Sequence, residues 1–205
     1  MEPKWLEWAK QLQSIAQAGL TYSKDVYDLE RFELIRNVSM EIISEHTDVS
    51  KTVIKDLFAN ETGYATPKVD VRSVVFKDNK ILMVREKTDG KWALPGGWAD
   101  IGLTPSEVAV KEVKEESGFD VKASKLIGVL DKKCHPHPPS PNHTYKIFIQ
   151  CEIIGGQPKE GIETSEVDFF AEKELPTLSI PRNTESQIKL SFKHLHNPQE
   201  SAYFD

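Results

Sequence analysis

The chain has 205 residues, a formal net charge of −6 and 39% hydrophobic residues, enough for one core of ~150 residues and a smaller attached piece. Its 28% charged residues are typical of a folded globular protein and not of a disordered one. No apolar run approaches the roughly 18 residues of a membrane span, and the N-terminus lacks the apolar region of a secretion signal.

The cysteine content and the net charge indicate the cellular compartment and the kind of partner that the protein can have. The only two cysteines, Cys134 and Cys151, make no disulfide framework, so we expect a cytoplasmic protein with reduced thiols and no membrane partner. The acidic balance argues against tight capture of long nucleic acid. It does not argue against a phosphate-bearing substrate, because a divalent metal can bridge two negative partners.

Residues 1–63 are predicted to form a helical domain. Apolar residues from Trp5 to Ala16 recur at helical spacing, and Gly19 is predicted to end that helix. A second helix is expected over residues 25–46, and a short third one around 53–58. Since amphipathic helices must bury their apolar stripes, we expect a homodimer contact here, with packing inside the chain as the alternative.

Residues 64–205 are predicted to form a second domain in which strands outnumber helices. The segment 77–80 suits a tight hairpin, because Asp and Asn tolerate positive φ. Helices are expected at 105–117 and 185–195. Strands are expected at 69–76, 81–84, 126–130, 145–154 and 167–170. This mixture predicts a layered α/β or α+β fold.

The helix at 105–117 is defined at both ends. Thr104 is its expected N-cap, Pro105 occupies the first helical position and Glu107 completes a capping-box spacing. Gly118 is the expected left-handed residue that ends it. The helix therefore offers a rigid frame for the side chains that it carries.

Three glutamates share one face of this helix. Glu112, Glu115 and Glu116 stand at i, i+3 and i+4, where like charges repel one another. A solvated acidic face is the simplest explanation of such a cluster. The preceding glycine pair favours the alternative, in which the carboxylates bind Mg²⁺ or Mn²⁺, the hard cations that prefer oxygen ligands.

The segment from Gly97 to Phe119 resembles the Nudix box, G-x5-E-x7-R-E-U-x-E-E-x-G-U, in which U is apolar. It keeps the three helix glutamates and both flanking glycines. It departs at Leu103, where the pattern has Glu, and at Lys111, where it has Arg. The second change keeps a positive charge but loses the bidentate fork of arginine.

The resemblance extends over nearly the whole chain, to the bacterial CDP-choline pyrophosphatase branch of the Nudix hydrolases. It implies an α/β/α sandwich with a mixed sheet behind an N-terminal helical extension. The implied reaction is metal-dependent hydrolysis of a nucleoside diphosphate linked to another moiety, with CDP-choline giving CMP and phosphocholine as the expected case.

The resemblance also implies roles for particular residues. Glu112, Glu115 and Glu116 would be metal ligands and catalytic residues, joined at the metal by the carbonyl of Gly96. The general base would be a helix glutamate or a late-loop residue, for which Glu166 is the candidate. Substrate contacts are predicted for the following residues of the late loop, the second strand and the His-Pro loop: Glu163, Arg85, His135 and His137.

These candidates have simpler interpretations. Glu163 and Glu166 would also fit an ordinary charged turn, and Arg85 a surface ion pair. His135 and His137 are expected to line a substrate pocket or a subunit contact, with a surface role as the alternative.

Several functions remain open at this stage. ADP-ribose or another nucleotide sugar is the alternative substrate class, and short RNA cut at its 3′ end is a further one. A Nudix-fold sensor that binds a nucleotide without cutting it is the non-enzymatic alternative. The retained glutamates favour catalysis.

Overall fold

The computed structural model describes residues 3–205, apart from the side chain of Leu57, and these residues form two compact units. The first contains the chain up to Lys68 together with Pro138–His143, and the second contains Val69–His137 and Thr144–Asp205. Within residues 3–205, no helix is both long and apolar enough to span a bilayer.

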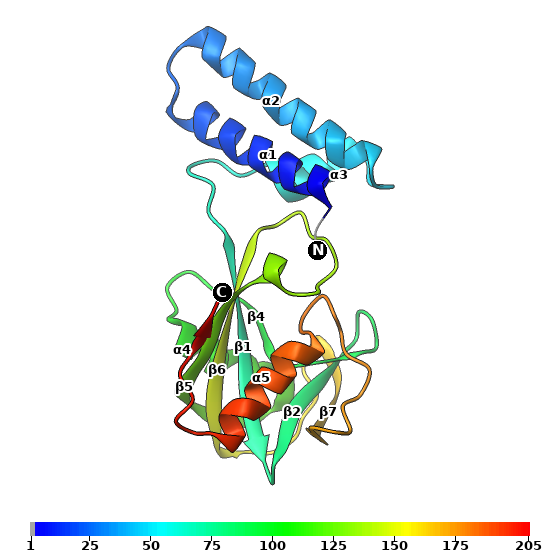
Figure 1. The fold of residues 1–205 in the computed structure, drawn as a ribbon, viewed down its shortest axis with the longest axis vertical. Helices are drawn as coiled ribbons and strands as arrows, with labels where there is room; N and C mark the ends of the chain where they lie inside the picture. The colour runs from blue at the N-terminus through cyan, green and yellow to red at the C-terminus, as the bar shows by residue number, and fades with distance from the viewer. Residues whose placement is uncertain (1–2) are drawn as a thin grey trace. The chain divides into compact units, whose positions relative to one another are not determined.

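The first unit is a helical hairpin followed by a short third helix (Figure 1). Asp25 caps the second helix by accepting hydrogen bonds from the amides of Tyr27 and Asp28. The buried core lies between the helices and contains Leu6, Ala9, Met40, Ile43, Ile54 and Ala59. The helices are α1 (Lys4–Tyr22), α2 (Val26–Glu45) and α3 (Lys51–Ile54), which continues into the π-helical turn η1 (Lys55–Ala59).

The prediction that Gly19 ends α1 is wrong. The helix continues to Tyr22. A Cβ atom at this position would lie 2.3 Å from ring atoms of Phe32 on α2. The glycine therefore serves the close approach of two helices. Ser39 strengthens the same contact, since its buried hydroxyl donates to the carbonyl of Ala9 at 2.8 Å.

The second unit is built on a mixed sheet in the order β3-β2-β1-β6-β5-β8, with β4 paired to β1 and β7 to β2. The β5–β8 pair is parallel, whereas β2–β7 and β5–β6 are antiparallel. The strands are β1 (Lys68–Lys77), β2 (Lys80–Glu86), β3 (Trp92–Ala93), β4 (Gly96–Trp98), β5 (Phe119–Asp131), β6 (Thr144–Gly156), β7 (Thr164–Ala171) and β8 (Tyr203–Phe204).

A helix packs on each face of this sheet, and Figure 1 shows α5 (Glu185–His196) lying across one of them. Ile188 and Phe192 of α5 belong to a core with Val74 of β1. Val108 and Val113 of α4 (Pro105–Ser117) belong to a second core with the neighbouring strand residues. The alternation of β1 side chains between the two cores gives the predicted α+β layers.

The structure extends several predicted elements. Asp78 and Asn79 form the expected hairpin with φ of 51° and 58°. Strand β5 begins at Phe119 and not at 126, because residues 119–124 alternate apolar and polar side chains along a strand that is buried on one face. The short strands β3, β4 and β8 carry too few residues to show a pattern.

Candidate active site

Helix α4 is fixed at both ends as predicted. The Thr104 hydroxyl accepts from the amide of Glu107, whose carboxylate in turn accepts from the amide of Thr104, a complete capping box. Gly118 ends the helix in the left-handed region with φ of 78°.

Glu116 is the buried member of the acidic group, at 8% exposure. Its Oε2 accepts a hydrogen bond of 3.0 Å from the amide of Gly96. Burial raises the pKa of Glu116 to about 8, against the opposing effects of the Arg72 charge and the Gly96 hydrogen bond. Because burial disfavours the ionised form of Glu116, a cation next to this carboxylate would stabilise its negative charge.

Glu112 lies against the other residue of the glycine pair. A Cβ atom on Gly97 would be 3.3 Å from the carboxyl carbon and from both carboxyl oxygens of Glu112. The glycine therefore leaves that carboxylate open on the side of the loop. Burial also raises the pKa of Glu112, and Glu115 adds to this, whereas Lys111 opposes it.

Glu115 is more exposed and shares a lysine with its neighbours. The Lys111 ammonium lies 2.9 Å from Asp100, 3.4 Å from Glu115 and 3.7 Å from Glu112. The hydrogen bond to Asp100 is the main reason why the pKa of Lys111 is raised. A single ammonium thus faces three carboxylates.

The donor set fits a divalent cation, although its members are not gathered around one point. Within residues 3–205, no group of three or more His, Cys, Asp or Glu side chains is placed to hold one metal ion. Glu116 turns toward Gly96, whereas Glu112 and Glu115 turn toward Lys111. Side-chain rotation would be needed for the three carboxylates to meet. Gly96 contacts Glu116 through its amide, and its carbonyl as a ligand stays a prediction.

A buried ionic cluster next to Glu116 was missed by the sequence analysis. Asp70 accepts two hydrogen bonds of 2.8 Å from Arg72 and a third of 2.8 Å from Lys146. All three residues are at most 6% exposed. Charged residues at alternate positions of the apolar strand β1, and one within β6, were the signal that could have revealed it.

Arg72 connects this cluster to the acidic helix. Although burial alone would lower its pKa, Asp70, Glu116 and Glu86 together raise it. Its Nη1 also donates to the carbonyl of Leu94, beside the glycine pair. Arg72 therefore places a fixed positive charge behind Glu116.

The rear of α4 is held by the loop that leads into β7. The buried Thr164 hydroxyl donates to the carbonyl of Glu116 and accepts from the amide of Gly161, both at 2.8 Å. A Cβ atom on Gly161 would lie 2.5 Å from the carbonyl oxygen of Glu115. The loop thus contacts the helix backbone directly behind the two glutamates.

The structure pairs two of the predicted site residues with each other. Arg85 of β2 and Glu166 of β7 face each other across the strands, with Nη1 and Oε1 2.6 Å apart and both side chains about half exposed. Glu163 is exposed, and its carbonyl accepts from the amide of Lys87. Glu86, next to Arg85, is instead buried and paired with Arg182.

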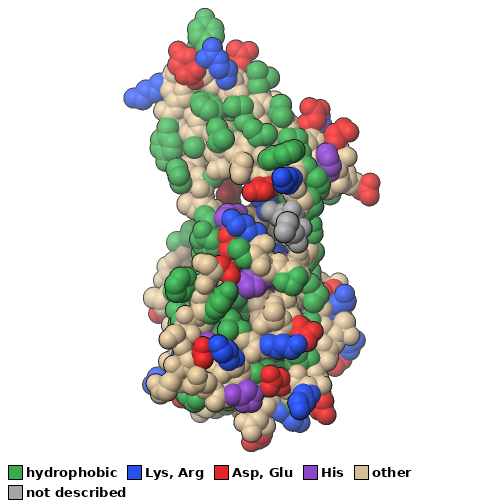
Figure 2. Space-filling model, in the orientation of Figure 1, with side chains coloured by type: hydrophobic (Ala, Val, Ile, Leu, Met, Phe, Trp, Pro, Cys, Tyr) green, Lys and Arg blue, Asp and Glu red, His purple; other side chains and the backbone are tan. Residues whose placement is uncertain are grey.

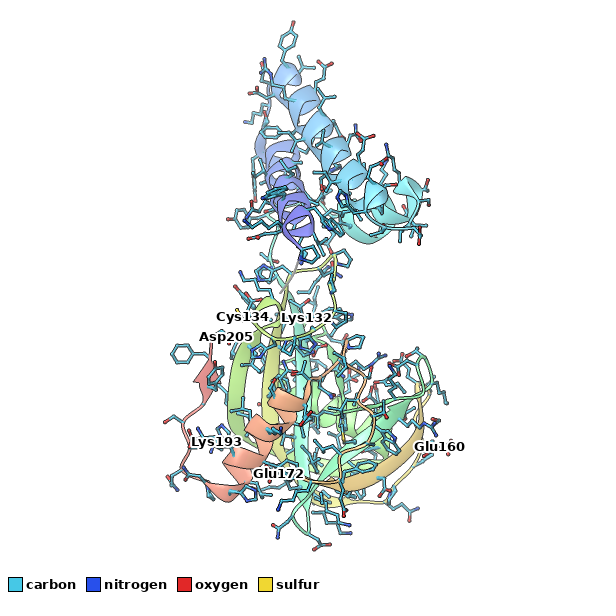
Figure 3. All side chains as sticks on the ribbon, turned by 45° about the vertical axis from the view of Figure 1, so that its right-hand side comes forward. Lys132, Cys134, Glu160, Glu172, Lys193 and Asp205 are labelled. Atoms are coloured by element: carbon cyan, nitrogen blue, oxygen red, sulfur yellow. The ribbon has the colours of Figure 1, made fainter. Side chains whose placement is uncertain are left out.

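The two predicted histidines make contacts within the second unit. The His135 ring is 3.1 Å from Asp205, which Figure 3 shows near Cys134. The His137 Nδ1 donates to the carbonyl of Ile180 at 2.6 Å, and its Nε2 faces the amide nitrogen of Gln187 at 3.0 Å. These bonds require the neutral ring, and burial lowers the pKa of His137 to about 4. Their role in substrate binding stays a prediction.

Known proteins match both parts of the chain. The profile of the NUDIX domain matches residues 66–191, and that of a UDP-X-like, N-terminal oligomerisation domain matches residues 3–58. The chain therefore belongs to the Nudix family. It is a hydrolase of the pyrophosphatase kind, as its relatives are.

Three relatives are especially similar. The first is a Bacillus subtilis (strain 168) protein named "Putative ADP-ribose pyrophosphatase YjhB". It is 51% identical over 205 residues, and the match covers 100% of this chain and 99% of that protein. The crystal structure of a UDP-X diphosphatase is 32% identical with a TM-score of 0.64, covering 98% of both chains. That of an ADP-ribose pyrophosphatase from Streptococcus suis 89-1591 is 38% identical with a TM-score of 0.63, covering 68% of this chain and 100% of that one.

Proposed function

We propose that the protein hydrolyses the diphosphate bond of a nucleoside diphosphate linked to a sugar, with ADP-ribose as the first candidate and a UDP-linked compound as the second. The observation that carries this proposal is the capped helix α4, which sets Glu112 and Glu116 against the glycine pair Gly96–Gly97. The names of the three relatives support the substrate class. None of them favours the CDP-choline expected from sequence, or RNA.

In the proposed reaction, water attacks one phosphorus of the diphosphate and the bridging P–O bond breaks. Each product then carries one phosphate, so ADP-ribose would give AMP and ribose 5-phosphate. Bound Mg²⁺ or Mn²⁺ would polarise the phosphoryl oxygen and lower the pKa of the attacking water.

The chain's own residues would hold and balance these charges. Glu112, Glu115 and Glu116 would supply carboxylate oxygens, and Arg72 would stabilise the ionised Glu116 from behind. Since Glu166 is paired with Arg85, we propose a helix glutamate as the general base.

A substrate panel tests the proposal. Purified full-length protein with Mg²⁺ or Mn²⁺ would be given ADP-ribose, UDP-sugars, CDP-choline and a short RNA, with products separated by chromatography. We expect release of the nucleoside monophosphate from ADP-ribose or a UDP-sugar. CMP and phosphocholine as the preferred products would restore the CDP-choline prediction, and no product with any metal would favour the sensor.

We also propose that residues 1–63 act as an oligomerisation domain for a hydrolase domain at 64–205, and that the protein is a homodimer. Trp8, Ile15 and Tyr22 stand seven residues apart on α1 and are 56%, 54% and 65% exposed. Figure 2 shows hydrophobic side chains over the visible face of this unit. Such a stripe is typical of a helix that packs against a second copy.

Light scattering of wild-type protein and of a Trp8→Lys Ile15→Lys variant tests the dimer. We expect a dimer for the wild type and a folded monomer for the variant. A monomeric wild type at micromolar concentration would contradict the proposal.

A further inference from the structure

Lys111 is not shared equally among its three carboxylates. Its ammonium is 2.9 Å from Asp100 in the loop after β4, and 3.4 and 3.7 Å from Glu115 and Glu112 on its own helix. Only the Asp100 contact has the length of a charged hydrogen bond. The lysine is thus bound most closely to the loop, although it stays within ion-pair distance of the two glutamates.

Asp100 lies three residues before a position where the chain departs from the Nudix pattern. Leu103 occupies the place of the pattern's glutamate and is 39% exposed. The amide of Leu103 donates to the carbonyl of Asp100 at 3.2 Å, closing a turn that keeps the two positions close. A carboxylate is therefore present at the start of this turn although the leucine at its end cannot supply one.

We propose that Asp100 is a positioning residue, which holds the Lys111 ammonium beside the loop and so keeps Glu112 and Glu115 available to a divalent cation. The inference rests on the proposed function, since it concerns the same three glutamates. It adds a residue that acts through Lys111 and that does not itself touch the metal or the substrate.

The physical reason is competition between two cations for the same oxygens. Without the Asp100 charge, the strongest partners left for Lys111 are Glu115 and Glu112. An ammonium bound there would occupy carboxylate oxygens and repel an approaching divalent ion. Metal binding would then have to displace the lysine first.

The test measures Mn²⁺ affinity without substrate, by electron paramagnetic resonance of free Mn²⁺, on full-length proteins. Asp100→Asn removes the charge and keeps the size of the side chain. Asp120→Asn is the matched control. Asp120 of β5 forms a similar exposed ion pair, at 2.8 Å, with Lys114, which lies on the same helix as Lys111. Each Asp100 form is also measured with Lys111→Gln.

We expect Asp100→Asn to raise the Mn²⁺ dissociation constant about fivefold, the upper range for an exposed ion pair. Asp120→Asn is expected to leave it unchanged. In the Lys111→Gln background, Asp100→Asn is expected to have no further effect, because the residue through which it acts is gone. A purely structural role would not produce this dependence on Lys111.

Two results would overturn the inference while leaving the proposed function intact. Both suppose that the wild type binds Mn²⁺ and hydrolyses its substrate. In the first, Asp100→Asn binds Mn²⁺ like the wild type. In the second, Asp100→Asn weakens Mn²⁺ binding equally with and without Lys111. If the wild type neither binds Mn²⁺ nor hydrolyses any substrate of the panel, the proposed function fails and the inference fails with it.

Discussion

The amide of Gly96 donates a 3.0 Å hydrogen bond to the carboxylate of Glu116, 20 residues further along the chain. This bond joins β4 to the last turn of α4. It fixes the orientation of one buried carboxylate relative to the glycine pair. Because the pKa of Glu116 also responds to the charges of Arg72, Glu112 and Glu86, its charge state depends on residues from four elements, β1, β2, β4 and α4.

Glu116→Gln is expected to fold normally and to lose at least about 100-fold in kcat, the scale for a lost contact at a metal site. The amide side chain keeps an acceptor for Gly96 but removes the charge. Thermal melting and turnover at saturating Mg²⁺ are the measurements. Glu160→Gln, which changes an exposed glutamate on a loop, is the control. Equal turnover of Glu116→Gln and wild type would remove Glu116 from the site.

Gly97→Ala is expected to weaken Mn²⁺ binding with little effect on the melting temperature. The new methyl group would lie 3.3 Å from the Glu112 carboxylate, and the flexible end of that side chain would move away. Gly155→Ala is the matched control, because its methyl group would meet Asp120 at an ordinary 3.6 Å. Similar Mn²⁺ affinities for the two variants would contradict a role for Glu112 in binding the metal.

The stability of the protein is expected to fall in mild acid because of His137. Burial lowers its pKa from 6.5 to about 4, so between these values the unfolded chain binds more protons than the folded one. The contribution of His137 to the free energy of unfolding is fully present above pH 6.5 and is lost as the pH falls toward 4.

Urea unfolding at pH 7.5, 5.5 and 4.5 measures this effect, with His137→Asn for comparison. The variant is expected to be less stable at pH 7.5 but to lose less stability on acidification. Parallel losses in both proteins would show that other groups are responsible.

Gly19→Ala is expected to destabilise the helical unit by about 1–3 kcal/mol, the usual cost of overpacking. In an unconstrained helix the same change would stabilise by about 1 kcal/mol, so the sign separates the two explanations. The contact that opposes the methyl group is the Phe32 ring at 2.3 Å. Thermal unfolding of Gly19→Ala, with and without Phe32→Leu, is the measurement, and the leucine is expected to recover part of the loss.

The elements with strong local signals were predicted from sequence within a few residues. The bounds 105–117 of α4 are those of the structure, because Thr104, Glu107 and Gly118 act locally on the backbone. Gly19 was misinterpreted because the residue that requires a glycine there, Phe32, lies on another helix. Local patterns carry no information about such contacts.

The site was predictable only as a set of helix positions. Periodicity placed Glu112, Glu115 and Glu116 on α4, but not the turn of Glu116 toward Gly96 and of the other two toward Lys111. The Asp70–Arg72–Lys146 cluster was missed because its three charges come from two strands and meet only when the sheet forms.

The hydroxyl group of Thr164, the first residue of β7, ties the loop before that strand to the backbone of helix α4. Thr164 is bonded to the backbone of both Glu116 and Gly161, so insertions or deletions at 157–163 would be transmitted to α4. Exchanging that loop between relatives would therefore also disturb the proposed hydrolytic centre. A successful graft would have to carry the threonine and the glycine with it.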